Sequence, residues 1–317
     1  MWAHPNDSFN VDIGKYFFRL YPEGHLEETV RLTSLELVRR GHAPLTRQQY
    51  FVFLGIHIIL AKHPKVPVSE CFRPFDPEVY DTAYLGLQRF MKIQRYNAIA
   101  ACLQFADTPV EGRGFWAVEP LVAAFNAKRR EVLSPGRKCC IDESFSEWRG
   151  DGSDIRPDRG CPMITKTITK PHDIGIMIKN LCDVDSGIMY AIEIAAGRLE
   201  MSQRQFNNEG ILQGAGYCLR LTKGLQGSGR IILGDSAFAS FITCKELYER
   251  RGLYFIGHVK SASRYFPKTY LQQEVNYGAR GDSAVATTTT ANGLRVLAVG
   301  WNEGKRDRHG NIIPKTY

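Results

Sequence analysis

The chain has 317 residues, of which 44% are hydrophobic and 23% charged, so it can bury a core and is too apolar to remain disordered. It contains no run of about 18 uncharged apolar residues, which predicts that no helix spans a membrane, and its N-terminus has no pattern of a secretory signal. The net charge is +8, with 16 basic and 14 acidic residues in 1–136 and 25 basic and 19 acidic residues in 137–317. The basic second part suits a polyanion such as nucleic acid, although many soluble domains carry a charge of this size.

The cysteines predict reduced thiols and no zinc site. No C-x-x-C occurs, and adjacent cysteines are poorly spaced to share one tetrahedral metal. The eight cysteines are Cys71, Cys102, Cys139, Cys140, Cys161, Cys182, Cys218 and Cys244.

Residues 1–136 have the pattern of a helical domain. Thr46 followed by Gln49 is a capping box, and it predicts a helix over Gln49–Lys62. Apolar residues at helical spacing predict a second helix over 79–105. Pro120 begins a third helix, which the Ser-Pro-Gly sequence at 134–136 ends.

After Gly136 the apolar pattern becomes that of strands and turns. One helix is expected over Ser240–Arg251, a hairpin turn over Asp183–Gly187 and an irregular connection over Gly278–Asn292. Strands followed by strand–helix–strand predict a mixed α/β sheet. The expected strands are Lys138–Asp142, Gly175–Cys182, Ile188–Ala195, Arg230–Asp235, Leu253–Lys260 and Leu294–Trp301.

Asp142 and Asp235 each follow an apolar strand. Ligands gather at the carboxyl ends of strands in open α/β sheets, so the two carboxylates can share one crevice and hold Mg²⁺ or Mn²⁺. A pair of such ions can promote cleavage of a phosphodiester. Taken alone, however, an Asp at a strand end is more readily a turn or cap residue than a metal ligand. Glu143 is expected to point to the opposite face of the sheet and not to be a ligand.

The surroundings of these residues resemble the motifs of piggyBac-type transposases. The stretch Ser134–Gly150 is similar to the motif of that family's first catalytic Asp, and Asp235–Ser240 is similar to its second. Lys166–Ile176, Cys182–Met189 and Arg251–Lys260 resemble further family motifs in the same order. The resemblance extends over roughly residues 15–305.

The resemblance implies an incomplete RNase H-like mixed sheet core in residues 137–317, with an insertion starting after about residue 260, preceded by a mainly helical N-terminal domain in 1–136. It also implies DNA cleavage and joining by three Asp residues with Mg²⁺ or Mn²⁺. Asp142 and Asp235 match the first two positions as catalytic residues and metal ligands. Asp282 and Asp307 are the remaining candidates for the third, and neither resembles its motif. We therefore expect a truncated chain with little or no strand transfer of its own.

The partner implied by the resemblance is DNA, at transposon ends or in genomic sequence, and the expected location is the nucleus. A homodimer is left open, and no membrane partner is expected. Two other hypotheses stay open: a domesticated, non-catalytic DNA-binding or interaction protein, and an unrelated Mg²⁺-dependent phosphohydrolase. The candidate DNA-contacting residues, which could equally lie in solvated loops or in packing positions, are Arg149, Lys166, Lys170, Lys260, Arg264 and Lys268.

Overall fold

A computed structural model describes residues 13–74, 85–111, 113–148, 162–167, 174–259, 265–275, 279–311 and 315–316. The chain divides into two compact units, one formed by 1–111 with 116–124 and the other by 112–115 with 125–317. The division falls within α6 (Glu119–Val132), before the boundary at residue 136 expected from the sequence.

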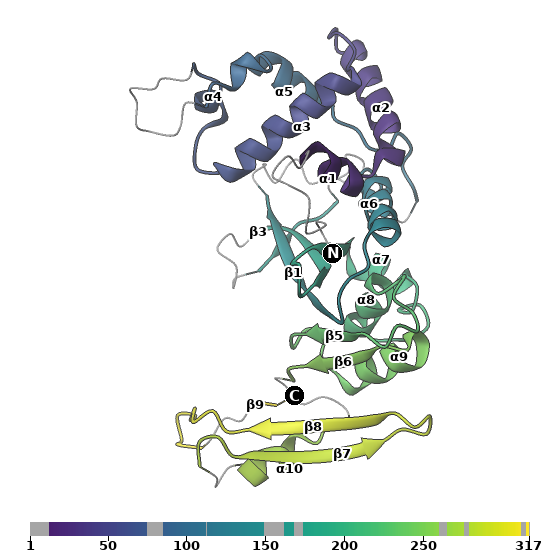
Figure 1. The fold of residues 1–317 in the computed structure, drawn as a ribbon, viewed down its shortest axis with the longest axis vertical. Helices are drawn as coiled ribbons and strands as arrows, with labels where there is room; N and C mark the ends of the chain where they lie inside the picture. The colour runs from purple at the N-terminus through teal and green to yellow at the C-terminus, as the bar shows by residue number, and fades with distance from the viewer. Residues whose placement is uncertain are drawn as a thin grey trace, which may run out of the picture. The chain divides into compact units, whose positions relative to one another are not determined.

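The described part of the first unit is helical (Figure 1). Throughout the described residues of the chain, every helix is too short or too polar to cross a bilayer. The helices of this unit before α6 are α1 (Ile13–Leu20), η1 (Glu23–His25), α2 (Leu26–Arg39), α3 (Arg47–Lys62), α4 (Val68–Cys71), η2 (Leu87–Arg89) and α5 (Ile93–Cys102).

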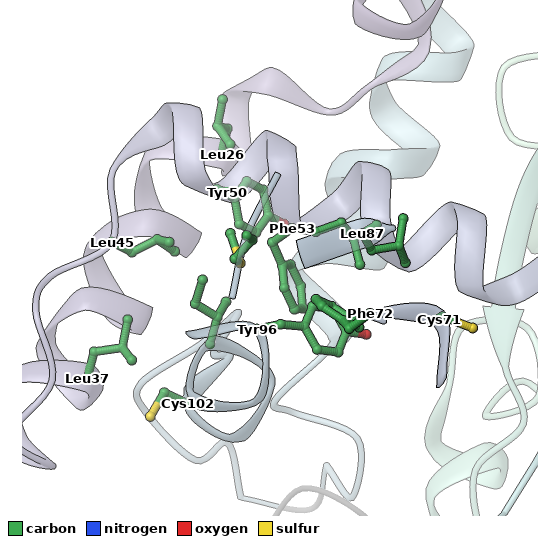
Figure 2. Packing of buried hydrophobic residues seen from close by; sticks show 13 residues of the cluster. Leu26, Leu37, Leu45, Tyr50, Phe53, Cys71, Phe72, Leu87, Tyr96 and Cys102 are labelled. Carbon is green, nitrogen blue, oxygen red and sulfur yellow. The ribbon is translucent and has the colours of Figure 1, made fainter. Parts of the chain in front are cut away.

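Helix α3 begins where its capping box predicts. The Thr46 side chain accepts a hydrogen bond from the backbone N–H of Gln49 at 3.1 Å, which satisfies a donor that the first helical turn leaves unpaired. The helix buries Phe53 in an aromatic cluster with Tyr96 and Phe72 (Figure 2). The ring centroids of Phe53 and Phe72 lie 5.1 Å and 5.4 Å from that of Tyr96, so this cluster joins α3 to α5 and to the residue that follows α4.

The single helix predicted over 79–105 is wrong within the described residues. The backbone of Gly86 is left-handed, with φ 62°, and it precedes the short turn η2. Lys92 is extended, with ψ 141°, so α5 starts only at Ile93. Apolar spacing alone did not reveal these two breaks, because Leu87 and Met91, which contribute to that spacing, are buried in a turn instead of in a helix.

The second unit is built on a mixed sheet whose strands run in the order β4-β3-β1-β5-β6, with β2 (Thr165–Lys166) also paired to β3. Strand β3 is antiparallel to both β1 and β4, whereas β5 is parallel to β1 and β6 is parallel to β5. The mixed sheet expected from the sequence is therefore present. The strands are β1 (Lys138–Glu147), β3 (Ile174–Asp183), β4 (Met189–Ile194), β5 (Ile231–Gly234) and β6 (Tyr254–Gly257).

The hairpin between β3 and β4 turns on Asp183. Its carboxylate accepts the N–H of Gly136 at 2.8 Å and both the N–H and the hydroxyl of Ser186, at 3.0 and 2.5 Å. Gly187 follows with φ 69°, a conformation that favours glycine. The turn expected at Asp183–Gly187 is confirmed.

Three helices follow β4 in the second unit, namely α7 (Arg198–Gln203), α8 (Gln213–Leu221) and α9 (Phe241–Arg251). Helix α9 starts after Ser240, whose hydroxyl accepts the N–H of Thr243 at 3.0 Å, and it connects β5 to the parallel strand β6. The buried residues Ile141, Leu181 and Ile232 form the core under these helices.

A separate small sheet contains β7 (Ser283–Thr289), β8 (Arg295–Trp301) and β9 (Lys315–Thr316), with α10 (Lys268–Val275) preceding it (Figure 1). The irregular connection expected over Gly278–Asn292 is wrong, because its described part contains the whole of β7. That segment is rich in β-branched Thr and Val, and it pairs with β8 from Ser283↔Trp301 to Thr289↔Arg295.

Candidate functional site

The sheet brings Asp142 and Asp235 side by side. Strands β1 and β5 pair in parallel up to Ile141↔Gly234, and an Asp follows immediately on each strand. Paired strands lie about 4.8 Å apart, so the two carboxylates start from neighbouring positions at the same edge of the parallel ladder. We expect the two carboxylates to lie about 4–8 Å apart, a separation that one bridging ion or two neighbouring ions could span.

The sequence pattern predicts that a strand ends at Asp142, and this prediction is wrong. Strand β1 continues to Glu147 through its pairing with β3, in which Asp142 lies opposite Asn180. Asp142 is thus the first residue of β1 beyond the end of β5. It is exposed, its Oδ1 accepts the N–H of Glu143 at 2.7 Å, and the surrounding strand restricts its backbone.

Asp235 lies in a hydrogen-bonded turn. Its Oδ1 accepts the N–H of Ala237 at 2.9 Å, and its backbone carbonyl accepts the N–H of Phe238 at 3.1 Å. Gly214 of α8 packs on this turn, where an added Cβ would lie 2.7 Å from the carbonyl oxygen of Ala237. The exposed carboxylate of Asp235 is therefore carried by a backbone that both α8 and its own turn hold.

The charges of both aspartates act on the thiol of Cys140. Burial raises the pKa of Cys140, and the charges of Asp142 and Asp235 raise it further. Burial also raises the pKa of Cys182, the cross-strand partner of Cys140, with added effects of Cys140 and Asp142. Both carboxylates therefore act on the same thiol, which places them in one local environment.

On the other face of the sheet, Glu143 forms an ion pair with Lys179 of β3. The expectation that Glu143 points away from Asp142 is confirmed. The ammonium of Lys179 also lies 5.3 Å from the ring centroid of Phe238 and 5.5 Å from that of Tyr217 on α8. The sequence showed only a lysine within an apolar strand, and its partners become evident only when distant segments are packed together.

The predicted DNA-contacting residues are only partly placed. Lys166 is exposed on β2, and Lys268 is half-buried at the start of α10. Tyr265, three residues before Lys268 in the sequence, packs against Phe241, with the two ring centroids 5.8 Å apart. Outside the described residues lie Arg149, Lys170, Lys260 and Arg264.

The two candidates for a third acidic ligand are used in local turns of the small-sheet segment. Asp282 accepts the N–H of Ala279 at 2.7 Å. Asp307 accepts the N–H groups of His309 and Asn311 at 2.8 and 3.0 Å, and the hydrogen bonds from Asn311 are the leading cause that lowers its pKa. Within the described ranges, no set of three or more His, Cys, Asp and Glu side chains is arranged to hold a metal ion.

Comparison with known proteins identifies the family. A family model described as Transposase IS4 matches residues 14–305. The chain belongs to this transposase family. Among curated proteins, none matches it.

The fold agrees with this assignment. The structure described as the cryo-EM structure of piggyBac transposase synaptic complex with hairpin DNA is similar, with a TM-score of 0.72 and 20% sequence identity. The match covers 95% of this chain and 59% of that one, so the chain spans about three fifths of the transposase it matches. The transposase resemblance expected from the sequence is confirmed, and the mixed α/β fold, similar to that of piggyBac transposase, is consistent with the RNase H-like core that the resemblance implies.

The Asp pair of this transposase-family chain fits a hard divalent cation. Carboxylate oxygens are the ligands that Mg²⁺ and Mn²⁺ prefer, and Mg²⁺ usually takes one or two protein carboxylates while keeping several waters. Both carboxylates are exposed, which leaves room for water and for a phosphate. Asp142 and Asp235 are thus the residues that would hold such an ion.

Proposed function

We propose that this chain is a DNA-binding protein of piggyBac transposase type, which acts in the nucleus and holds Mg²⁺ or Mn²⁺ between Asp142 and Asp235. The observation that carries the proposal is the register of β1 and β5, which puts these two residues next to each other at the end of the parallel ladder. Its support is the family match over residues 14–305 and the basic composition of the chain.

The chain's own residues supply position and charge. The strand pairing of Asp142 and the turn of Asp235 hold the two carboxylates at one edge, where together they favour a cation. When bound there, the divalent ion would polarise a phosphate oxygen of the DNA backbone and lower the pKa of a water. The basic side chains, Lys166 among them, would neutralise phosphates on either side.

Two carboxylates coordinate one divalent ion more readily than two such ions. Two-metal phosphoryl transfer also requires a second ion fixed opposite the leaving oxygen. We therefore propose that the chain binds one divalent ion weakly and does not cleave DNA by itself.

Mn²⁺ binding measured by electron paramagnetic resonance tests the site. We expect binding to the chain that Asp142→Asn and Asp235→Asn each abolish, while Asp107→Asn, an exposed control in the first unit, leaves it unchanged. Equal binding by all four proteins would remove the Asp pair as the site. It would leave a non-catalytic DNA-binding protein as the better description.

A nicking assay on supercoiled plasmid with Mg²⁺ or Mn²⁺ tests the activity. We expect no nicking above the level of Asp142→Asn. Strong nicking that disappears in Asp142→Asn would show that another residue completes the site, and Asp282 and Asp307 are then the first to substitute.

A further inference from the structure

Lys179 is a buried cation on the face of the sheet opposite to that of Asp142. It lies in the middle of β3, opposite Glu143 on β1, and its relative exposure is 7%. Its ammonium pairs with the carboxylate of Glu143, the residue that directly follows Asp142. The side chains of Lys179 and Glu143 therefore connect β3 to the segment of β1 that carries Asp142.

The same ammonium also contacts the segment that carries Asp235. It lies 5.3 Å from the ring centroid of Phe238, whose backbone N–H closes the turn on the Asp235 carbonyl at 3.1 Å. The Phe238 ring is 2% exposed, and the Thr243 hydroxyl donates to the Phe238 carbonyl at 2.6 Å, so this ring has a defined position. One charged group thus contacts both Glu143, which follows Asp142, and Phe238, which closes the turn of Asp235.

The other acidic side chain near Lys179 has its own partners. Glu193 lies opposite Lys179 on β4, and its carboxylate pairs with Arg204 at 2.9 Å and with Arg220 at 3.0 Å. Lys179 is therefore balanced by Glu143 together with the faces of two aromatic rings, Phe238 and Tyr217.

A lysine in this position is not needed to fill the core. A buried ion pair is commonly replaced by apolar residues of similar volume without loss of stability, because desolvation offsets much of the attraction between the charges. An apolar side chain could not attract both the carboxylate of Glu143, which follows Asp142, and the ring of Phe238, which lies in the turn of Asp235. The arrangement favours a role in geometry over a role in stability.

We propose that Lys179 is a positioning residue that holds Asp142 and Asp235 at a fixed separation from the far face of the sheet. The inference rests on the proposed divalent-ion site. It assigns the precision of that site to Lys179, Glu143 and Phe238, none of which touches the ion.

Four variants separate this role from general stability. Lys179→Met keeps the length of the side chain and removes its charge, but it leaves the Glu143 carboxylate partly buried and unpaired. The double variant with Glu143→Gln and Lys179→Met removes that penalty as well. Asp142→Asn reports loss of the ion site, and Lys245→Met, which removes a surface ion pair of α9 at 2.8 Å, is the matched control.

The measurements are the thermal midpoint, Mn²⁺ affinity and amide hydrogen exchange followed by mass spectrometry over 138–147 and 235–240. We expect the double variant to melt close to the unsubstituted chain, yet to bind Mn²⁺ about 10-fold or more weakly, since residues that orient metal ligands commonly contribute 10–100-fold to affinity. Exchange should be faster in both segments in the two Lys179 variants and unchanged in Lys245→Met.

The outcomes distinguish the inference from the function on which it rests. If Asp142→Asn abolishes Mn²⁺ binding and both Lys179 variants bind and exchange like the unsubstituted chain, the inference is wrong and the site stands. If the unsubstituted chain binds no Mn²⁺, the proposed site is wrong. Exchange in the two segments then decides alone, and unchanged rates in the Lys179 variants overturn the inference.

Discussion

Glu193 shows how a single buried carboxylate can hold two cations. Its side chain is 11% exposed, and it pairs with Arg204 and Arg220, whose side chains are 10% and 13% exposed. Glu200 pairs with Arg204 on its other side at 2.7 Å. The group links β4 to α7 and α8, so its charges are balanced only while these elements are packed together.

Glu193→Gln should therefore destabilise the second unit strongly. The amide keeps the shape of the side chain but removes the charge that balances two buried guanidinium groups, and breaking such a pair commonly costs about 3–5 kcal/mol. Urea unfolding measures the change. Glu27→Gln breaks an ion pair with Arg47 whose side chains are 70% and 52% exposed, and it should have a much smaller effect. Equal losses for the two variants would contradict the role assigned to Glu193.

Asp183 makes stability depend on pH. Burial by itself would raise the pKa of this carboxyl, but the hydrogen bonds from Ser186 and Gly136 outweigh it, and the pKa is lower than usual. Since the folded-state pKa is below that of the unfolded chain, ionised Asp183 stabilises the fold. Its contribution is complete above about pH 4 and is lost as the pH falls through the folded-state pKa.

Asp183→Asn should lower the free energy of unfolding at pH 7 by about 1–3 kcal/mol, because an amide places a donor where the turn supplies only donors. The difference from the unsubstituted chain should shrink as the pH is lowered below about 4. Urea unfolding at pH 7 and at pH 3 measures it. A difference that stays constant between these pH values would show that the carboxylate charge is not the cause.

At the scale of elements, α3 combines a buried and an exposed apolar face. Phe53 is 2% exposed within the aromatic cluster, whereas Ile58 on the same helix is 54% exposed. Phe53→Ala should cost about 3–5 kcal/mol because it leaves a cavity among Tyr50, Tyr96 and Phe72. Ile58→Ala should change stability by less than about 0.5 kcal/mol. Chemical unfolding followed by circular dichroism at 222 nm compares them, and similar midpoints would mean that the cluster is not the core of this unit.

Local chemistry made some elements predictable and others not. The start of α3 follows from Thr46 and Gln49, and the β3–β4 turn follows from Asp183 and Gly187, because the interactions that form them span a few residues. By contrast, β7 exists through its pairing with β8, and its Thr-rich sequence carries little apolar alternation. The break between η2 and α5 likewise depends on a left-handed Gly86 that the apolar spacing does not encode.

For the molecule as a whole, the position of the candidate site was easier to predict than its support. Two apolar strands, each followed by Asp, imply adjacent carboxylates as soon as the strands pair in parallel. Lys179 and its partner Glu143 are 36 positions apart in the sequence, and only the assembled sheet brings them together. The candidate residues that follow apolar runs are thus visible in the sequence, whereas their packing partners from distant segments are not.

The charge of the whole chain leads to the last prediction. With a net charge of +8, most of it in residues 137–317, contacts with DNA should be made chiefly to phosphates and should be weak and sensitive to salt. For duplex DNA the affinity should fall about tenfold between 50 and 200 mM salt for every two phosphates neutralised.

Fluorescence anisotropy with a labelled duplex and a labelled single strand measures this dependence. Lys166→Glu, an exposed site on β2, should weaken binding and flatten the salt dependence, because it removes a cation and adds a repulsive charge among the phosphate contacts. Lys65→Glu makes the same change in net charge at an exposed site in the first unit, and it should have the smaller effect. Equal effects would indicate that binding follows net charge alone. No binding of either probe at low ionic strength would exclude DNA as a partner of this chain.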